Sequence, residues 1–338
     1  MPVRHFSDLT RRGRGRRLRL IARRALEERG LGDCSLSLLG DDTNTLFRAR
    51  AADGAAFVVR IGLYGPIAHS PAEAAAETSW LAALRRAGLT VPEPVPDRRG
   101  RLVSTMSAPG VEGERLVVVF RWLPGSLLEG RLTPGNVAAY GRLAAQLHAH
   151  ALGFRPPGDP PLPCYDRLFP FREPEVLFAP EPNPLLPPER REVFCRAAER
   201  VERAIGRLRS REPMRLLHGD FHAWNVLVHR GHLAAIDFED LMWGWPLQDI
   251  ATALYYLYHR PDFPDVQEGF RRGYEEAAPW PEAVPGELET FIAGRALVLA
   301  NDVLLMRADQ TAGLDIPEFF ARAERRLRAI LDGGEFRG

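Results

Sequence analysis

The segment of residues 216–240, LLHGDFHAWNVLVHRGHLAAIDFED, constrains the fold of this chain more than any other stretch. Its first part gathers polar side chains at irregular spacing, which is typical of a loop. Its second part places alternating apolar residues on both sides of the turn sequence HRGH, which predicts a β-hairpin. Because a hairpin brings its two ends side by side, Asn225 before it and Asp237 after it should lie close together.

Two kinds of site could use these side chains. His218, Asp220 and His222 alternate, so on a strand they would share one face, and His and Asp are ligands in zinc and two-metal sites. Such a site needs further ligands, but His229 and His232 flank the predicted turn, where polar residues are normally solvated. The pattern therefore favours the second kind of site over a metal-dependent hydrolase.

The second kind is a phosphotransferase site. Protein kinases carry a catalytic loop of the form H-R-D-x-x-x-x-N, followed by the metal-binding aspartate of a D-F-G tripeptide. Here Asn225 follows Asp220 at the same interval, and the hairpin ends on the tripeptide Asp-Phe-Glu at residues 237–239. Amide and carboxylate oxygens suit Mg²⁺, so Asn225 and Asp237 can hold the metal on the phosphates of ATP.

HGDFHAWN together with IDFED resembles the aminoglycoside phosphotransferase and choline kinase family, the small-molecule relatives of protein kinases. The family motif is HGDxHxxN with a distal ID[FW], and this sequence matches every fixed position. The resemblance implies ATP and Mg²⁺ as cofactors, Asp220 as the catalytic aspartate that orients the acceptor hydroxyl and accepts its proton, and Asn225 and Asp237 as metal ligands. It also implies that His218 and His222 brace the loop through hydrogen bonds.

The rest of the chain fits an α+β, two-lobed protein-kinase-like fold. Short β-like runs before residue 124 predict a small antiparallel sheet, with a hairpin turn at Asp53-Gly54. One helix is inserted at residues 70–88, with Ser70 as its N-cap and Gly88 at its end. Helical patterns dominate afterwards. We therefore expect a basic helical extension at 1–34, an N-lobe that covers the nucleotide at 35–120, and a larger helical C-lobe at 121–338 with the catalytic loop and the acceptor site.

The predicted nucleotide site departs from the kinase pattern at one position. The chain has no lysine, so all 45 of its basic residues are arginines, and any step that uses lysine must here use arginine. Kinases place a lysine on the third strand, paired with a glutamate on the next helix. Arg60 occupies that position, with Glu77 as the expected partner and Glu73 as the alternative. The turn at Gly40, Thr43 and Asn44 should present backbone N–H groups to the phosphates.

The acceptor is expected to be a small hydroxylated molecule. Trp224, Glu239, Asp240 and Trp243 lie near the catalytic motif in sequence, and aromatic and acidic groups together suit a cationic acceptor such as an amino alcohol or an aminoglycoside. Core packing is the alternative role for the tryptophans, because large aromatic side chains are mostly buried.

Bulk composition agrees with a cytoplasmic enzyme. The net charge of +1 gives no global field for nucleic acid or a membrane surface. The three cysteines are scattered, which suits a reducing compartment, and no secretory signal or membrane-spanning run is found. Two alternatives share the fold. A protein Ser/Thr kinase is disfavoured by the missing A-P-E segment, and a non-catalytic nucleotide-binding scaffold by the intact Asp220, Asn225 and Asp237.

Overall fold

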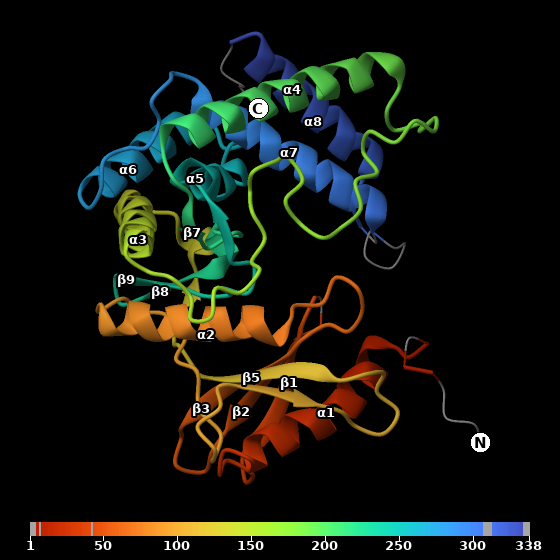
Figure 1. The fold of residues 1–338 in the computed structure, drawn as a ribbon, viewed down its shortest axis with the longest axis vertical. Helices are drawn as coiled ribbons and strands as arrows, with labels where there is room; N and C mark the ends of the chain where they lie inside the picture. The colour runs from red at the N-terminus through yellow and green to blue at the C-terminus, as the bar shows by residue number, and fades with distance from the viewer. Residues whose placement is uncertain (1–4, 7, 42, 307–312, 334–338) are drawn as a thin grey trace. The chain divides into compact units, whose positions relative to one another are not determined.

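The computed structural model describes residues 5–6, 8–41, 43–306 and 313–333 (Figure 1). The outer ends of the predicted N-terminal extension and of the predicted C-lobe lie outside these ranges. Contacts divide the chain into two compact units. The first comprises Met1–Gly125, Arg155–Pro161 and Ala234–Glu239; the second comprises Ser126–Phe154, Leu162–Leu233 and Asp240–Gly338. The first holds a small antiparallel sheet and the second is mainly helical, so the predicted α+β class is confirmed.

The first unit is built on a sheet with the strand order β1-β2-β3-β5-β4. All neighbouring strands are antiparallel, and the turn between β2 and β3 contains Gly54 in the left-handed region, as expected for the Asp-Gly hairpin. The elements of this unit are α1 (Arg11–Glu27), β1 (Ser35–Asp41), β2 (Thr45–Arg50), β3 (Ala56–Ile61), α2 (Pro71–Arg86), β4 (Val103–Met106) and β5 (Arg115–Arg121).

Helix α2 begins and ends where its sequence predicts. The Ser70 side chain accepts a hydrogen bond from the backbone of Glu73, and the Glu73 side chain accepts one from the backbone of Ser70, which completes a capping box. Pro71 opens the helix, and Gly88 follows its end with φ 88°. Glu73 is therefore engaged at the start of its own helix.

The two faces of the sheet have different neighbours. Phe57, Val59 and Ile61 of β3 pack in one core with the apolar face of α1, which lies along the sheet in Figure 1. Side chains alternate along a strand, so Arg60 points to the opposite face, where it meets Glu77 of α2. The basic N-terminal helix thus contributes its apolar residues to the core of the first unit.

The second unit packs its helices around two deeply buried ones. Every residue of α5 (Pro246–Tyr255) is buried, and α7 (Glu287–Leu305) contacts α5, α4 and α8. The other elements are β6 (Ser126–Leu127), η1 (Leu128–Arg131), α3 (Pro134–Leu152), α4 (Pro188–Arg211), β7 (Arg215–Leu217), η2 (Ala223–Asn225), β8 (Val226–His229), β10 (Met242–Gly244), α6 (Phe263–Glu275) and α8 (Ile316–Leu331). Strand β9 (His232–Ala235) begins in this unit, and its last two residues are assigned to the first. Within the described ranges, no helix is both long enough and apolar enough to cross a membrane.

The proline-rich stretch between α3 and α4 contains no helix or strand in its described residues, yet part of it is firmly attached. Leu168, Leu177 and Leu186 are buried. The Asn301 side chain of α7 accepts hydrogen bonds from the backbone N–H groups of Val176 and Leu177, at 2.8 and 3.1 Å. This stretch is an ordered part of the second unit from Leu162 onward.

Helices α3 and α6 approach each other through glycine. A Cβ atom added at Gly141 would lie 1.9 Å from the carbonyl oxygen of Phe270, and one added at Gly273 would lie 1.8 Å from that of Ala138. Backbone atoms cannot yield as a flexible side chain would. We therefore predict that Gly141→Ala lowers the free energy of unfolding by about 1–3 kcal/mol, the usual cost of overpacking, as measured by urea denaturation.

Gly206 in α4 is the matched control, because a Cβ added there meets no atom within 4 Å. Gly206→Ala should stabilise the protein by up to about 1 kcal/mol, since alanine favours the helix. Equal effects of the two substitutions would contradict close backbone packing as the reason for Gly141.

Candidate functional site

The first unit holds a buried arginine among carboxylates. The guanidinium of Arg60 donates to both carboxylate oxygens of Glu77, and the Nη1–Oε1 distance is 2.8 Å. Only 10% of the Arg60 side chain and 3% of the Glu77 side chain are exposed, so this pair is held in a dry, two-pronged geometry. Arg60 thus meets the glutamate expected for it, while Glu73 caps its helix.

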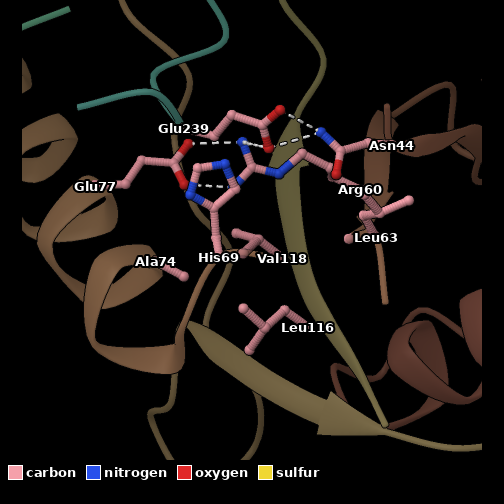
Figure 2. A pocket seen from close by; sticks show the side chains of 10 residues that line it. Asn44, Arg60, Leu63, His69, Ala74, Glu77, Leu116, Val118 and Glu239 are labelled. Atoms are coloured by element: carbon pink, nitrogen blue, oxygen red, sulfur yellow. Dashed lines mark hydrogen bonds and ion pairs between the residues drawn. The ribbon is translucent and has the colours of Figure 1, made fainter. Parts of the chain in front are cut away.

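Glu239 completes this cluster from another part of the chain. Both of its carboxylate oxygens accept from the Asn44 amide at 2.6 Å, and its Oε2 lies 3.8 Å from Arg60 Nη1. Figure 2 shows Glu77 and Glu239 pointing toward the Arg60 guanidinium, and Asn44 pointing toward Glu239. Glu239 was expected among the acceptor contacts. The structure places its carboxylate in this cluster, where it gains charge pairing with Arg60 and a hydrogen bond from Asn44.

Asp237 lies at the edge of the same cluster. Its carboxylate is 3.8 Å from Arg60 Nη1 and is 43% exposed, much more than the other two acids. Its backbone is left-handed, with φ 65°, which is uncommon for aspartate and costly outside special sites. Burial would lower the pKa of Arg60, but Glu77, Glu239 and Asp237 outweigh it and raise that pKa, so the guanidinium stays charged.

The predicted phosphate-covering turn lies between β1 and β2. Gly40 is part of β1, at a shift in register, while Thr43 is exposed and Asn44 is tied to Glu239. The acidic neighbour Asp41 is turned away toward Arg14 of α1, with an Nε–Oδ2 distance of 3.3 Å. Charge repulsion between Asp41 and an anion at this turn is thereby reduced.

The second unit holds the loop of residues 218–225 by its backbone. The carboxylate of Asp249 in α5 accepts from the N–H groups of His218 and Gly219, at 2.9 and 3.0 Å. Tyr140 of α3 donates its hydroxyl to the Phe221 carbonyl at 2.8 Å. Gly219 has φ 86°, and a Cβ there would lie 1.9 Å from the Asp240 carbonyl oxygen, so only glycine fits. Asp240 thus contributes its backbone to the shape of this loop.

The Asp220 carboxylate is surrounded by donors. Oδ1 accepts from Arg295 Nη2 at 2.7 Å, and Oδ2 lies 3.0 Å from His222 Nε2 and 3.3 Å from the Asn225 amide nitrogen. The Asp220 N–H group lies 3.4 Å from the His218 ring nitrogen. Both histidines, which were expected to brace the loop, therefore contact the aspartate. Burial would raise the pKa of Asp220, but Arg295, His222 and His218 hold it below its usual range.

Arg295 was missed by sequence reasoning. It lies in α7 and is 8% exposed, and it also donates to the Tyr256 hydroxyl at 3.1 Å. The only signal was its position: a single arginine in the otherwise apolar run FIAGRALVLA. An arginine buried in such a run needs an acidic partner, but the sequence does not say which one.

Aromatic side chains line the outer side of this loop. Trp224 is 40% exposed, and its ring packs edge-on against His222 and Tyr256, with centroids 5.5 and 5.2 Å away. Trp243 belongs to β10, is half-buried, and pairs with Leu216 of β7. Of the two tryptophans expected near the acceptor, Trp224 is thus the one placed beside the side chains that contact Asp220.

An ionised aspartate in a rigid H-G-D loop, and an arginine–glutamate pair on a small sheet, are the parts that define a kinase-like phosphotransferase. The comparisons agree. The phosphotransferase enzyme family matches residues 37–285, most of the chain. The protein therefore belongs to this family and is a phosphotransferase, as its resemblance to the aminoglycoside phosphotransferase and choline kinase family implied.

Individual proteins are similar to this chain in sequence or in fold. An uncharacterized protein of Deinococcus radiodurans is 30% identical over 277 residues, which cover 80% of this chain and 77% of the relative. The structure of a microcompartment-associated aminopropanol kinase has a TM-score of 0.73 at 24% identity and covers 94% of this chain and 99% of its own. The amicoumacin kinase hAmiN, in complex with AMP-PNP, Ca²⁺ and Ami, has a TM-score of 0.70 at 18% identity, with 93% of each chain covered. The kinase-like fold is thereby confirmed.

Asp302 lies two turns after Arg295 on α7 and gives a pH-dependent prediction. Burial, with Glu173 and Asp220 nearby, raises its pKa from 3.8 to about 6, although Arg295 opposes this. A carboxyl with a raised folded-state pKa binds its proton more tightly in the folded protein, so its contribution to stability is lost as pH rises from about 4 to about 6. Asp302→Asn should therefore flatten this decline and be more stable at pH 7 by on the order of 1–2 kcal/mol.

Urea denaturation between pH 4 and pH 7 measures this effect. Asp265→Asn, at an exposed position of α6, is the matched control and should leave the slope unchanged. The same decline in Asp302→Asn as in the native sequence would contradict the assignment.

Proposed function

We propose that this phosphotransferase moves the γ-phosphate of Mg·ATP to a hydroxyl of a small molecule. The observation that carries the proposal is the geometry of Asn225. Its amide nitrogen is bound to Asp220, through the backbone carbonyl at 3.0 Å and the carboxylate at 3.3 Å. This fixes the orientation of the amide and leaves its oxygen without a hydrogen bond from any described residue. A metal ligand needs that orientation.

Asn225 and Asp237 are the residues proposed to hold Mg²⁺. The donor set fits a hard cation: one amide oxygen and one carboxylate that is 43% exposed. When bound, Mg²⁺ would neutralise charge that develops on the phosphates. The complex of hAmiN with AMP-PNP and Ca²⁺ supports a nucleotide and a divalent metal as the cofactors of this fold.

Arg60 is proposed to bind the α- and β-phosphates in place of the usual lysine. Two nitrogens of the Arg60 guanidinium donate to Glu77, so the orientation of the guanidinium is fixed before the nucleotide binds. The turn with Gly40, Thr43 and Asn44 would add backbone N–H groups to the phosphates. The side-chain amide of Asn44 donates a hydrogen bond to Glu239 in this structure. We expect Asn44 to give up this hydrogen bond when the nucleotide binds.

Asp220 is proposed as the catalytic residue. Its depressed pKa keeps it ionised, so it can accept a hydrogen bond from the acceptor hydroxyl and orient the oxygen toward the γ-phosphate. The proton passes to the carboxylate as the new P–O bond forms, while the bond between the γ-phosphorus and the bridging oxygen of ATP breaks and ADP leaves. Positioning and charge supply most of the acceleration in such reactions, because the protein need not form a covalent intermediate.

The proposed acceptor is an amino alcohol, an aminoglycoside or a similar hydroxylated molecule, handled in the cytoplasm. The names of two structural relatives, an aminopropanol kinase and an amicoumacin kinase, support a small molecule. In this chain, half-exposed Trp224 beside Tyr256 offers aromatic faces near Asp220 for a cationic group. With Glu239 committed to Arg60 and Asn44, Trp224 is the best-placed of the residues expected at the acceptor site.

Transfer from radiolabelled ATP to a panel of amino alcohols and aminoglycosides tests the proposal. The native sequence should label at least one acceptor with Mg²⁺ present, and Asp220→Asn should reduce turnover at least about a hundredfold, the usual contribution of a catalytic base. Asp265→Asn should match the native sequence. Full activity of Asp220→Asn would refute the role of Asp220.

A further inference from the structure

The Asp220 carboxylate has little capacity left for a substrate. An ionised carboxylate offers about four lone-pair positions on its two oxygens. Oδ2 is used by His222 and by the Asn225 amide, and Oδ1 by Arg295. One position, on Oδ1, remains for the acceptor hydroxyl. The residue that shares Oδ1 therefore decides in which direction the remaining lone pair points.

Arg295 is held rigidly enough for that task. It comes from α7, whose residues are mostly buried. The same Nη2 atom that bonds Asp220 donates to the Tyr256 hydroxyl at 3.1 Å, and the guanidinium carbon lies 5.8 Å from the Tyr256 ring centroid. The Nε atom is buried and has no hydrogen-bond partner among the residues that the structure describes. A buried donor left unsatisfied is costly, which indicates that this guanidinium position is kept for something other than stability alone.

We propose that Arg295 is a positioning residue for phosphoryl transfer, which aims the free lone pair of Asp220 Oδ1 at the acceptor hydroxyl. The proposal rests on the proposed function. Arg295 acts through Asp220 and does not touch the acceptor or the nucleotide. It follows that loss of Arg295 lowers the rate of transfer, while the affinity for Mg·ATP is unchanged.

Size and charge explain why arginine suits this position. The guanidinium is planar and has its donors in a fixed fork, so one bond to Tyr256 fixes the direction of the bond to Asp220. A lysine could supply the charge but would rotate freely about its stem. Arg295→Lys should therefore keep part of the turnover. Arg295→Met, which has a side chain of similar length without the charge, should have the lowest turnover.

The first test compares Arg295→Met and Arg295→Lys with the native sequence. ADP release from Mg·ATP is measured with the pooled acceptor panel, and the Mg·ATP dissociation constant by calorimetry. Misplacement of a reacting group by about 1 Å costs about a hundredfold, so Arg295→Met should lose roughly that much turnover. The Mg·ATP dissociation constant of Arg295→Met should stay within about twofold of the native value. Turnover of Arg295→Lys should be about tenfold higher than that of Arg295→Met.

Arg200→Met is the matched control for packing. Arg200 is a part-buried arginine that donates to Thr290 of the same helix α7, at 3.0 Å, and it makes no contact with Asp220. The substitution Arg200→Met should leave turnover unchanged. Loss of activity in Arg200→Met equal to that in Arg295→Met would show a general sensitivity to α7 packing and overturn the proposal.

A double-mutant cycle separates positioning from folding. If Arg295 acts through Asp220, then Arg295→Met should have no further effect on turnover in the Asp220→Asn background. This double variant also removes both charges of the pair, so it should fold if Arg295→Met alone does not. If the losses of turnover caused by the two single substitutions multiply in the double variant, the proposal is overturned. Failure of the native sequence to release ADP would instead contradict the proposed function. Activity that Arg295→Met leaves unchanged would contradict the role of Arg295 and not the proposed function.

Discussion

The buried pair of Arg60 and Glu77 is the interaction on which the first unit depends. A guanidinium out of water needs full compensation, and here three carboxylates provide it, one from α2 and two from the segment that follows the predicted hairpin. This requirement joins a strand, a helix and residues 237–239 at one place. It also explains how arginine can be accommodated, in a chain without lysine, at the position where we propose that it replaces the kinase lysine. Arginine keeps the charge and gains a two-pronged grip on its partner.

The second unit solves a different problem, which is to hold an ionised carboxylate on a tight loop. Asp249 and Tyr140 hold the backbone of that loop through hydrogen bonds. His222 and Arg295 hold the Asp220 carboxylate. Helices α3, α5 and α7 each supply one of these contacts, so the packing of the helical unit and the shape of the loop are coupled. Rigid elements thus provide the positioning that phosphoryl transfer requires.

Local rules explain which features the sequence predicted. Capping at Ser70, the Asp-Gly turn and strand alternation at Arg60 are short-range effects, so the elements could be read from the sequence. The pairing of Arg60 with Glu77 was expected from the kinase pattern. The contacts of Glu239 and Arg295 could not be predicted in either way. Glu239 is adjacent to Asp240 in sequence, yet its carboxylate faces Arg60 and Asn44, because charge pairing over long sequence separation decides its direction. Arg295 lies 75 residues from Asp220, and no periodic pattern links a helix residue to a distant loop.

Calorimetric titration of ATP, with Mg²⁺ and then with a chelator, tests the central proposal, which is that Arg60 binds the nucleotide together with a metal held by Asp237 and Asn225. Binding should be tight only with Mg²⁺, and Asp237→Asn should lose that dependence, while Asp265→Asn should keep it. The same affinity in Mg²⁺ and in chelator, or no binding in either, would contradict the account.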